Sequence, residues 1–289
     1  MQNNSHQYPS TEVMIRLKRL IISLYFLSNV SLAIFAQIPS VLPQSSSIAS
    51  TATADTHNWC SFQNPAMLGY VEQTEVAAFF DNRFMMSELS TKTAQIAIQH
   101  DLLNTGVSIS HFGYSLYQEL LFGATFARNF SNKFAMGIQF NYMTNYFVSS
   151  NTYRGVLLAQ VGLSAQLSPN FNLSFNTFNP FQTNIQAETI EKRVPSIFSL
   201  GAQYILVENV MWRIQLDKEV SSNYRFATGM DYDVVKKMTL KIGVYGSDYL
   251  VPCLGISLKT NAVKINLNTE IHPLLGVNSS VGLNYQFLK

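Results

Sequence analysis

The residue types most often used in catalysis are sparse in this 289-residue sequence. Its histidines lack the HxxxH-type spacing of a metal site: His6, His57, His100, His111 and His272. Ser110 precedes His111 in a stretch with β periodicity, so the two side chains point to opposite faces and cannot act as nucleophile and base. The sequence also lacks GxSxG, CxxC and a glycine-rich phosphate loop. We therefore expect no enzyme, no metal and no cofactor.

Charged residues of both signs recur between positions 213 and 270, on what we expect to be one face of several strands: Arg213, Asp217, Arg225, Asp231, Asp233, Lys241, Lys264 and Glu270. Such residues can pair with one another and either hold a plug or line a wet lumen. A selectivity site is the alternative interpretation. Asp231 and Asp233 share a face and could bind a cation, but Arg225 on the same strand favours a salt bridge.

The elements that position these side chains are indicated by hydrophobic alternation, which is clearest in the last stretch, Val277–Phe287. Its apolar side chains, Val281, Leu283, Tyr285 and Phe287, alternate with small or polar ones, as in a strand with two different faces. Charged residues make up only 12% of the chain and aromatic residues also 12%. This composition favours an all-β transmembrane barrel over a soluble β-sandwich, which would carry more Lys and Glu on its outer faces.

Fourteen stretches show this alternation, and they predict antiparallel barrel strands: Thr74–Asn82, Thr91–Gln99, Thr105–Phe112, Glu119–Asn129, Lys133–Phe147, Tyr153–Leu167, Phe171–Phe178, Pro195–Ile205, Val210–Lys218, Tyr224–Asp233, Met238–Tyr245, Val251–Lys259, Val263–Ile271 and Val277–Phe287. Twelve or sixteen strands are the alternatives. Every second connection is short, which is typical of the periplasmic turns of outer-membrane barrels. We expect the last strand to pair with the first and close the barrel.

The N-terminal part of the chain predicts export. Residues 1–36 comprise a polar extension, Met1–Val13, and a secretory signal, Met14–Ala36, with a basic start and an apolar run. Residues 37–72 are expected to be a linker and a plug, and residues 73–289 the barrel. Within the plug, Asn64, Pro65, Ala66 and Gly69 supply turn chemistry. We place the protein in the outer membrane of a Gram-negative bacterium, with both termini in the periplasm.

The two cysteines offer a link between plug and wall. Cys60 lies in the expected plug, and Cys253 falls on the inward face of a strand. An exported protein can keep a disulfide, so we hypothesise a bridge between them. Two free buried thiols are the alternative.

The signal peptide, the Asn64-Pro65-Ala66 motif before the first strand, about fourteen strands and an aromatic-ended last strand together resemble the FadL-like barrels. Within that group the chain looks most like the PorV/PorQ-type proteins of Bacteroidota. The resemblance implies that the segment with the motif folds into the barrel lumen. FadL members carry hydrophobic molecules across the outer membrane, whereas PorV-like members are accessory barrels in protein secretion or surface attachment.

Three functions follow as hypotheses. The first is an accessory or scaffold barrel in protein secretion or outer-membrane assembly, with other outer-membrane or periplasmic proteins as partners. The second is a FadL-type passive uptake channel for a small hydrophobic ligand. The third, a barrel enzyme, would need a cluster of Ser, His or carboxylate groups on one face. In each case the barrel contacts outer-membrane lipid. The net charge of +2 and the absence of a basic patch argue against nucleic acid as a partner.

Overall fold

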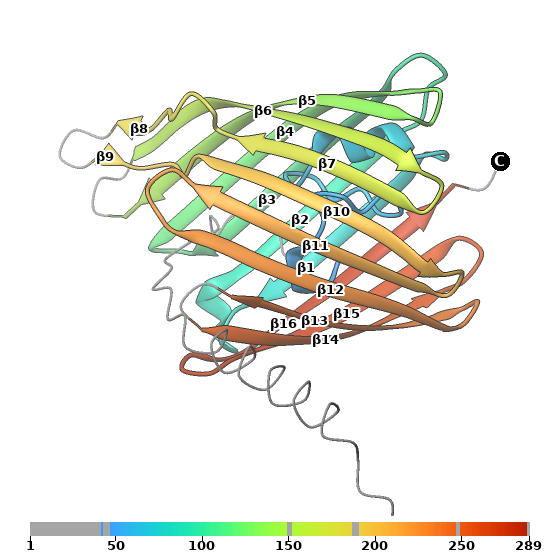
Figure 1. Ribbon diagram of the computed structural model, residues 1–289. Helices are drawn as coiled ribbons and strands as arrows, with labels where there is room; N and C mark the ends of the chain where they lie inside the picture. The colour runs from blue at the N-terminus through green and yellow to red at the C-terminus, as the bar shows by residue number, and fades with distance from the viewer. Residues whose placement is uncertain (1–41, 43–46, 149–151, 187–190, 247–248, 288–289) are drawn as a thin grey trace, which may run out of the picture. The chain divides into compact units, whose positions relative to one another are not determined.

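The computed structural model describes residue 42 and residues 47–148, 152–186, 191–246 and 249–287. These residues form a closed antiparallel barrel of fourteen strands, β1–β7 and β10–β16 (Figure 1). The predicted fold class and strand number are therefore confirmed. The expected extension and signal, residues 1–36, lie outside the described residues, as do residues 37–41 of the expected linker.

The barrel strands lie close to the stretches that alternation predicted. For example, the strand expected from Glu119 begins at Tyr117, and the one expected over Phe171–Phe178 has those bounds. The strands are β1 (Glu75–Asn82), β2 (Ser90–Ile98), β3 (Asn104–Tyr114), β4 (Tyr117–Phe130), β5 (Phe134–Phe147), β6 (Thr152–Ser168), β7 (Phe171–Phe178), β10 (Ile197–Val207), β11 (Val210–Glu219), β12 (Tyr224–Val235), β13 (Met238–Gly246), β14 (Leu250–Lys259), β15 (Val263–His272) and β16 (Gly276–Gln286).

Strand β16 closes the barrel by pairing with β1, with Leu283 opposite Ala78. Its alternation has the expected sense, since Leu283 is 48% exposed while its neighbour Asn284 is 6% exposed. Apolar side chains thus cover the outside of the wall, and most polar ones point inward. Closure leaves neither β1 nor β16 as an unpaired edge, which removes a template for association with other chains.

The short connection between β4 and β5 is built from residues in left-handed backbone conformation. Between β4 and β5, Ser131 and Asn132 both have φ of 55°. Two consecutive positive φ values are typical of a type I′ hairpin turn, whose twist matches that of the flanking strands. Such turns set the register between neighbouring strands and leave the longer connections at the opposite end of the barrel.

The longest connection in the wall, between β7 and β10, was expected to be a loop over Asn179–Val194. The structure adds two short paired strands to it, β8 (Ile185–Gln186) and β9 (Glu191–Lys192). Two residues in each strand are too few to have a readable alternation, so the sequence pattern could not reveal them.

Residues 47–72, called here the luminal segment, lie against the inward faces of the strands. They contain two short 3₁₀ helices, η1 (Ile48–Ser50) and η2 (Pro65–Tyr70), and a third, η3 (Ser87–Leu89), follows β1. Helix η2 contacts β3 to β6, and η1 contacts β12 to β14. No helix in the described part of the chain is long and apolar enough to span a membrane.

Candidate functional site

The predicted Asn-Pro-Ala motif lies where the luminal segment turns into η2. Asn64 is 1% exposed, and its Oδ1 atom accepts a hydrogen bond from the amide of Ala66 at 2.9 Å. Its Nδ2 atom donates to the carbonyl of Thr53 at 2.6 Å. Asn64 is therefore the N-cap of the helix, and Pro65 occupies the first helical position, where its missing N–H costs no hydrogen bond.

Two glycines of the barrel wall face this motif. A Cβ atom added at Gly137 of β5 would lie 2.5 Å from the carbonyl carbon and oxygen of Pro65, and one at Gly162 of β6 would overlap the Asn64 side chain. Gly137 and Gly162 are paired across the two strands. At Gly69, a Cβ atom would lie 3.2 Å from the backbone of β4. Glycine on both sides therefore lets segment and wall approach closely.

Amide side chains of the wall bind the backbone of the luminal segment. Gln95, Asn104 and Gln160 each make two hydrogen bonds to it, at 2.8–3.2 Å. Their partners are the amide of Ser61 and the carbonyls of Trp59, Phe62, Gln63, Leu68 and Val71. These bonds satisfy buried polar groups that the segment cannot pair internally. The alternation indicated which way Gln95 and Gln160 point, but it does not identify what they bind.

Two close ion pairs lie within the predicted charge group. Arg213 lies 2.7 Å from Asp231, and Arg225 lies 2.7 Å from Asp217. Each pair joins β11 to β12. Both pairs reach the luminal segment, because Arg213 also lies 3.6 Å from Asp55 and Arg225 donates to a carbonyl of η1 at 2.7 Å. The polar wall of this half of the barrel therefore binds the segment through charged groups.

The other members of the group bind further polar side chains, and Lys241 and Lys264 also interact electrostatically with Asp231 and Arg213. Glu270 accepts from the Tyr245 hydroxyl at 3.0 Å, Lys241 donates to Asn266 at 3.2 Å, and Lys264 contacts Asn58 of the segment. Asp233 does not lie among them. It is exposed at the turn end of β12 and accepts from Thr239 at 2.5 Å. Its inclusion in a luminal network was wrong, because the strand continues past the barrel interior at that point.

Asp55 is a buried partner that the sequence reasoning missed. Its side chain is fully buried and accepts hydrogen bonds from Asn58 at 3.0 Å and from Ser47. Burial is the largest single influence and would raise the pKa of this carboxyl. The Arg213 guanidinium, His57, Lys264 and the Ser47 hydrogen bond together outweigh burial and hold the pKa below its ordinary value. The available signal was that Asp55 is the single Asp, Glu, Lys or Arg residue between positions 37 and 71.

The hypothesised disulfide is absent, since Cys60 and Cys253 are both free and buried. Cys253 packs against Ile48 and Ala49 of η1. Cys60 instead follows Trp59, whose ring packs against β3 at Gly106. The two thiols thus belong to contacts that the luminal segment makes with different parts of the wall, which rules out the bridge.

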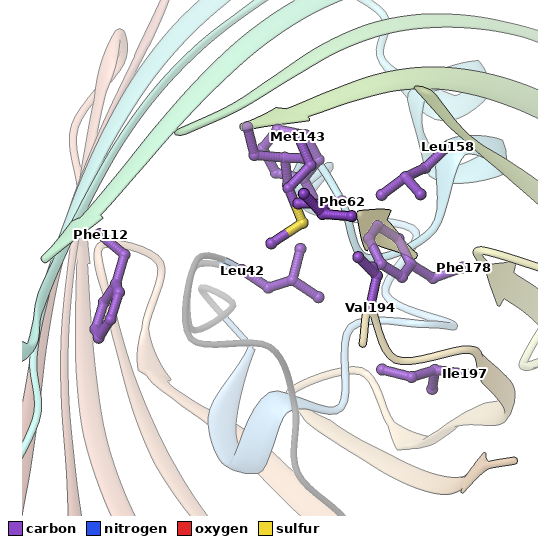
Figure 2. Packing of buried hydrophobic residues seen from close by; sticks show 10 residues of the cluster. Leu42, Phe62, Phe112, Met143, Leu158, Phe178, Val194 and Ile197 are labelled. Carbon is purple, nitrogen blue, oxygen red and sulfur yellow. The ribbon is translucent and has the colours of Figure 1, made fainter. Parts of the chain in front are cut away.

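A buried apolar cluster lies inside the barrel, where sequence reasoning expected polar side chains. It comprises Leu42, Phe62, Phe112, Leu121, Met143, Leu158, Phe178, Ile185, Val194 and Ile197. Figure 2 shows Phe62, Met143, Leu158 and Phe178 converging, with Leu42 and Val194 beside them and Phe112 apart from the rest. Its wall members lie in strands β3 to β7 and β10, in the half of each strand that is farther from the short turns such as Ser131–Asn132.

The sequence does carry a sign of this cluster: on the inward face of three strands, apolar residues take the place of polar ones. Met143 follows Asn141, Leu158 precedes Gln160, and Phe178 follows Asn176, each at a spacing of two. Residues at that spacing share a face of a strand. These apolar side chains therefore point inward, and they mark the part of the lumen that is not polar.

The β7–β10 connection covers one side of the apolar cluster. Asn179 fixes its two ends, donating to the carbonyls of Thr183 at 3.1 Å and Val194 at 3.0 Å. Lys192, from the same connection, lies 2.5 Å from both Glu119 Oε1 and the hydroxyl of Tyr117. This ion pair joins the connection to β4.

A cavity of about 30 Å³ adjoins the cluster, between Leu42, Phe62 and Phe178 on one side and Ser50 and Asp217 on the other. It has room for one or two water molecules. A larger ligand would therefore have to displace side chains. Within the described ranges, no three His, Cys, Asp or Glu side chains come together as metal ligands.

No family model matches the sequence, and no curated protein does either. Solved structures do match the fold. The toluene transporter TbuX of Ralstonia pickettii has a TM-score of 0.67 at 10% identity, over 89% of this chain and 99% of that one. The toluene transporter TodX of Pseudomonas putida has a TM-score of 0.60 at 10% identity, over 88% and 98%. A FadL homologue of Pseudomonas aeruginosa has a TM-score of 0.56 at 10% identity, over 86% and 96%.

Proposed function

We propose that this chain is an outer-membrane barrel for passive uptake of small hydrophobic molecules. The observation that carries the proposal is the apolar cluster inside the barrel. A membrane barrel needs apolar residues only on its lipid face, and inward side chains are ordinarily polar. A buried patch with Phe112, Met143, Leu158 and Phe178 on the inward face is instead the kind of lining that binds apolar ligands.

The similar structures support this direction, since their names describe toluene transporters and a FadL homologue. They favour the uptake hypothesis over the secretion scaffold that sequence reasoning placed first. We place the chain in the outer membrane of a Gram-negative bacterium, with the apolar outer wall in contact with lipid and the short turns and both termini in the periplasm. The narrower PorV/PorQ-type assignment stays a prediction.

The test is uptake of a radiolabelled aromatic hydrocarbon by bacteria that express this chain and lack a hydrophobe channel of their own. We expect uptake above that of cells with an empty vector, and a clear reduction for Leu158→Asn in the apolar cluster. Gln166→Asn is the matched control, because Gln166 lies on the same face of β6 but outside the cluster. Uptake no faster than in the empty-vector cells would contradict the proposal.

One observation favours the scaffold as a second candidate. The luminal segment fits the wall closely at Gly137 and Gly162, so the lumen is filled beside η2. A barrel with a filled lumen is better suited to holding partner proteins than to conducting solutes. This candidate predicts that large outer-membrane proteins co-purify with the chain from detergent-solubilised membranes. Capture of the barrel by itself, together with hydrocarbon uptake, would exclude it.

A further inference from the structure

The charged groups around the apolar cluster are already paired. Tyr117 packs against the cluster, and its hydroxyl donates to Glu119, which also binds Lys192 at 2.5 Å. At the other edge, beside the small cavity, Asp217 is paired with Arg225. The apolar region is therefore bordered by ion pairs in which each cation has a carboxylate partner.

The Glu119–Lys192 pair is largely shielded from solvent. The Glu119 side chain is 5% exposed and the Lys192 side chain 24%. A second cation at this end, Arg83, lies 5.9 Å from the Phe112 ring and interacts electrostatically with Asp81, Glu270 and Glu119. Lys192 and Arg83 therefore both have carboxylates beside them at this end of the cluster.

An anionic ligand would meet this negative charge. To bind Lys192, a carboxylate must replace Glu119 and leave that buried group without its cation, or share the lysine with it at close range. Both outcomes are unfavourable, because an unpaired buried charge and two adjacent carboxylates each carry a large electrostatic cost. An uncharged apolar molecule disturbs neither ion pair.

We propose that the apolar cluster accepts uncharged hydrophobic molecules and excludes carboxylates, and that Glu119 sets this selectivity by neutralising Lys192. The inference rests on the proposed uptake function and specifies its substrate class. Glu119 is then a specificity-determining residue. Removing its charge leaves Lys192, a partly buried cation at the edge of the cluster, without its carboxylate, which creates a site for an anionic head group.

The test is competition between 1-decanol and decanoate for the uncharged fluorophore N-phenyl-1-naphthylamine bound to the barrel in amphipol, at about pH 8, where decanoate is ionised. We expect decanol to displace the fluorophore from the wild type and decanoate to be at least about 10-fold weaker. Glu119→Gln should strengthen decanoate by about 10-fold or more and leave decanol nearly unchanged.

Two further variants distinguish the release of Lys192 from a general effect of substitution on ligand binding. Asp233→Asn removes an acid that lies away from the cluster, so it should leave both affinities unchanged. The double variant Glu119→Gln/Lys192→Met should lose the gain for decanoate, because the freed ammonium is gone. Heat-modifiable migration on gels checks that every variant folds.

The outcomes are distinguishable. If decanoate competes as well as decanol in the wild type, or if folded Glu119→Gln keeps decanol binding without gaining decanoate, the selectivity inference is overturned while the uptake function stands. If neither the fluorophore nor decanol binds the wild type, the uptake function fails and the inference fails with it.

Discussion

A single methyl group on the inner wall should loosen the luminal segment. In Gly137→Ala the new Cβ atom would lie 2.5 Å from the carbonyl carbon and oxygen of Pro65 and 2.7 Å from the amide nitrogen of Ala66. All three are backbone atoms, so no flexible side chain can yield. Carbon contacts are normally at about 3.5–4.0 Å. The overlap is therefore close to 1 Å, and overpacking of this kind costs about 1–3 kcal/mol.

This cost is smaller than the free energy with which the wall binds the luminal segment. The hydrogen bonds from Gln95, Asn104 and Gln160 alone number six, and each contributes about 1 kcal/mol. We therefore expect the segment to stay bound in most molecules. The population with a released segment should rise by about 5-fold to 150-fold, which corresponds to the same 1–3 kcal/mol.

The thiol of Cys60 reports this population, because it is buried while the segment is bound. The measurement is the rate at which a membrane-impermeant maleimide labels Cys60, in a Cys253→Ser background that leaves one thiol. When closing is faster than labelling, the rate is proportional to the released fraction. Gly137→Ala should raise it by about 5-fold to 150-fold.

Gly246→Ala is the matched control. It adds the same methyl group to a strand, but the nearest atom to the new Cβ is a side-chain carbon of Leu250 at 3.1 Å, and the luminal segment is not involved. Its labelling rate should equal that of the wild type. A correctly assembled Gly137→Ala barrel that labels as slowly as this control would refute the close fit between segment and β5.

Three other changes test the same structure. Asn64→Ala removes the N-cap of η2, which costs about 1 kcal/mol, so Cys60 labelling should rise several-fold; an unchanged rate would show that the cap does not hold the segment. Asp55→Asn should speed labelling at neutral pH. Because the pKa of Asp55 lies below its ordinary value of 3.8, its stabilisation is complete above pH 3.8 and is lost as the pH falls through the lowered pKa. Acid also slows the thiol reaction itself, so each rate is divided by that of the denatured chain at the same pH. This ratio should rise for the wild type only on strong acidification, and it should rise less for the variant. Leu283→Asp places a charge on the lipid face, which costs on the order of 2–4 kcal/mol near the midplane and somewhat less for Asp, so the assembled fraction on heat-modifiability gels should fall. Asn284→Asp, one residue further along and on the inward face, should assemble normally. Equal assembly of the two variants would contradict the assigned faces.

Much of the barrel was predictable because it depends on local patterns. The period-2 alternation in Val277–Phe287 assigns each side chain to a face, and the short connections assign neighbouring strands to hairpins. Closure between β1 and β16 followed because a membrane barrel cannot leave an edge. The turn at Asn64 was also readable, since the Asn-Pro pair is a local signal.

The contacts of the luminal segment were less predictable because they join residues far apart in the chain. The hypothesised Cys60–Cys253 bridge was wrong, although the inward direction of Cys253 was right. Direction alone does not say which part of the segment lies opposite a given strand. The inclusion of Asp233 failed for a related reason, because alternation gives the face of a residue but not its depth along the barrel.

The sequence by itself determined a barrel of about fourteen strands with an apolar outside, because strand alternation and turn chemistry act between near neighbours. The exact number came from the structure. Only the tertiary structure decided that Asp55 pairs with Arg213, that glycines of β5 and β6 receive the Asn64 turn, and that Phe112, Met143 and Phe178 form one apolar cluster beside the Glu119–Lys192 pair. Those contacts depend on barrel closure and on the path of the segment inside it. The path of the segment leaves no local pattern in the chain, because the curvature of the whole wall decides which residues face each other.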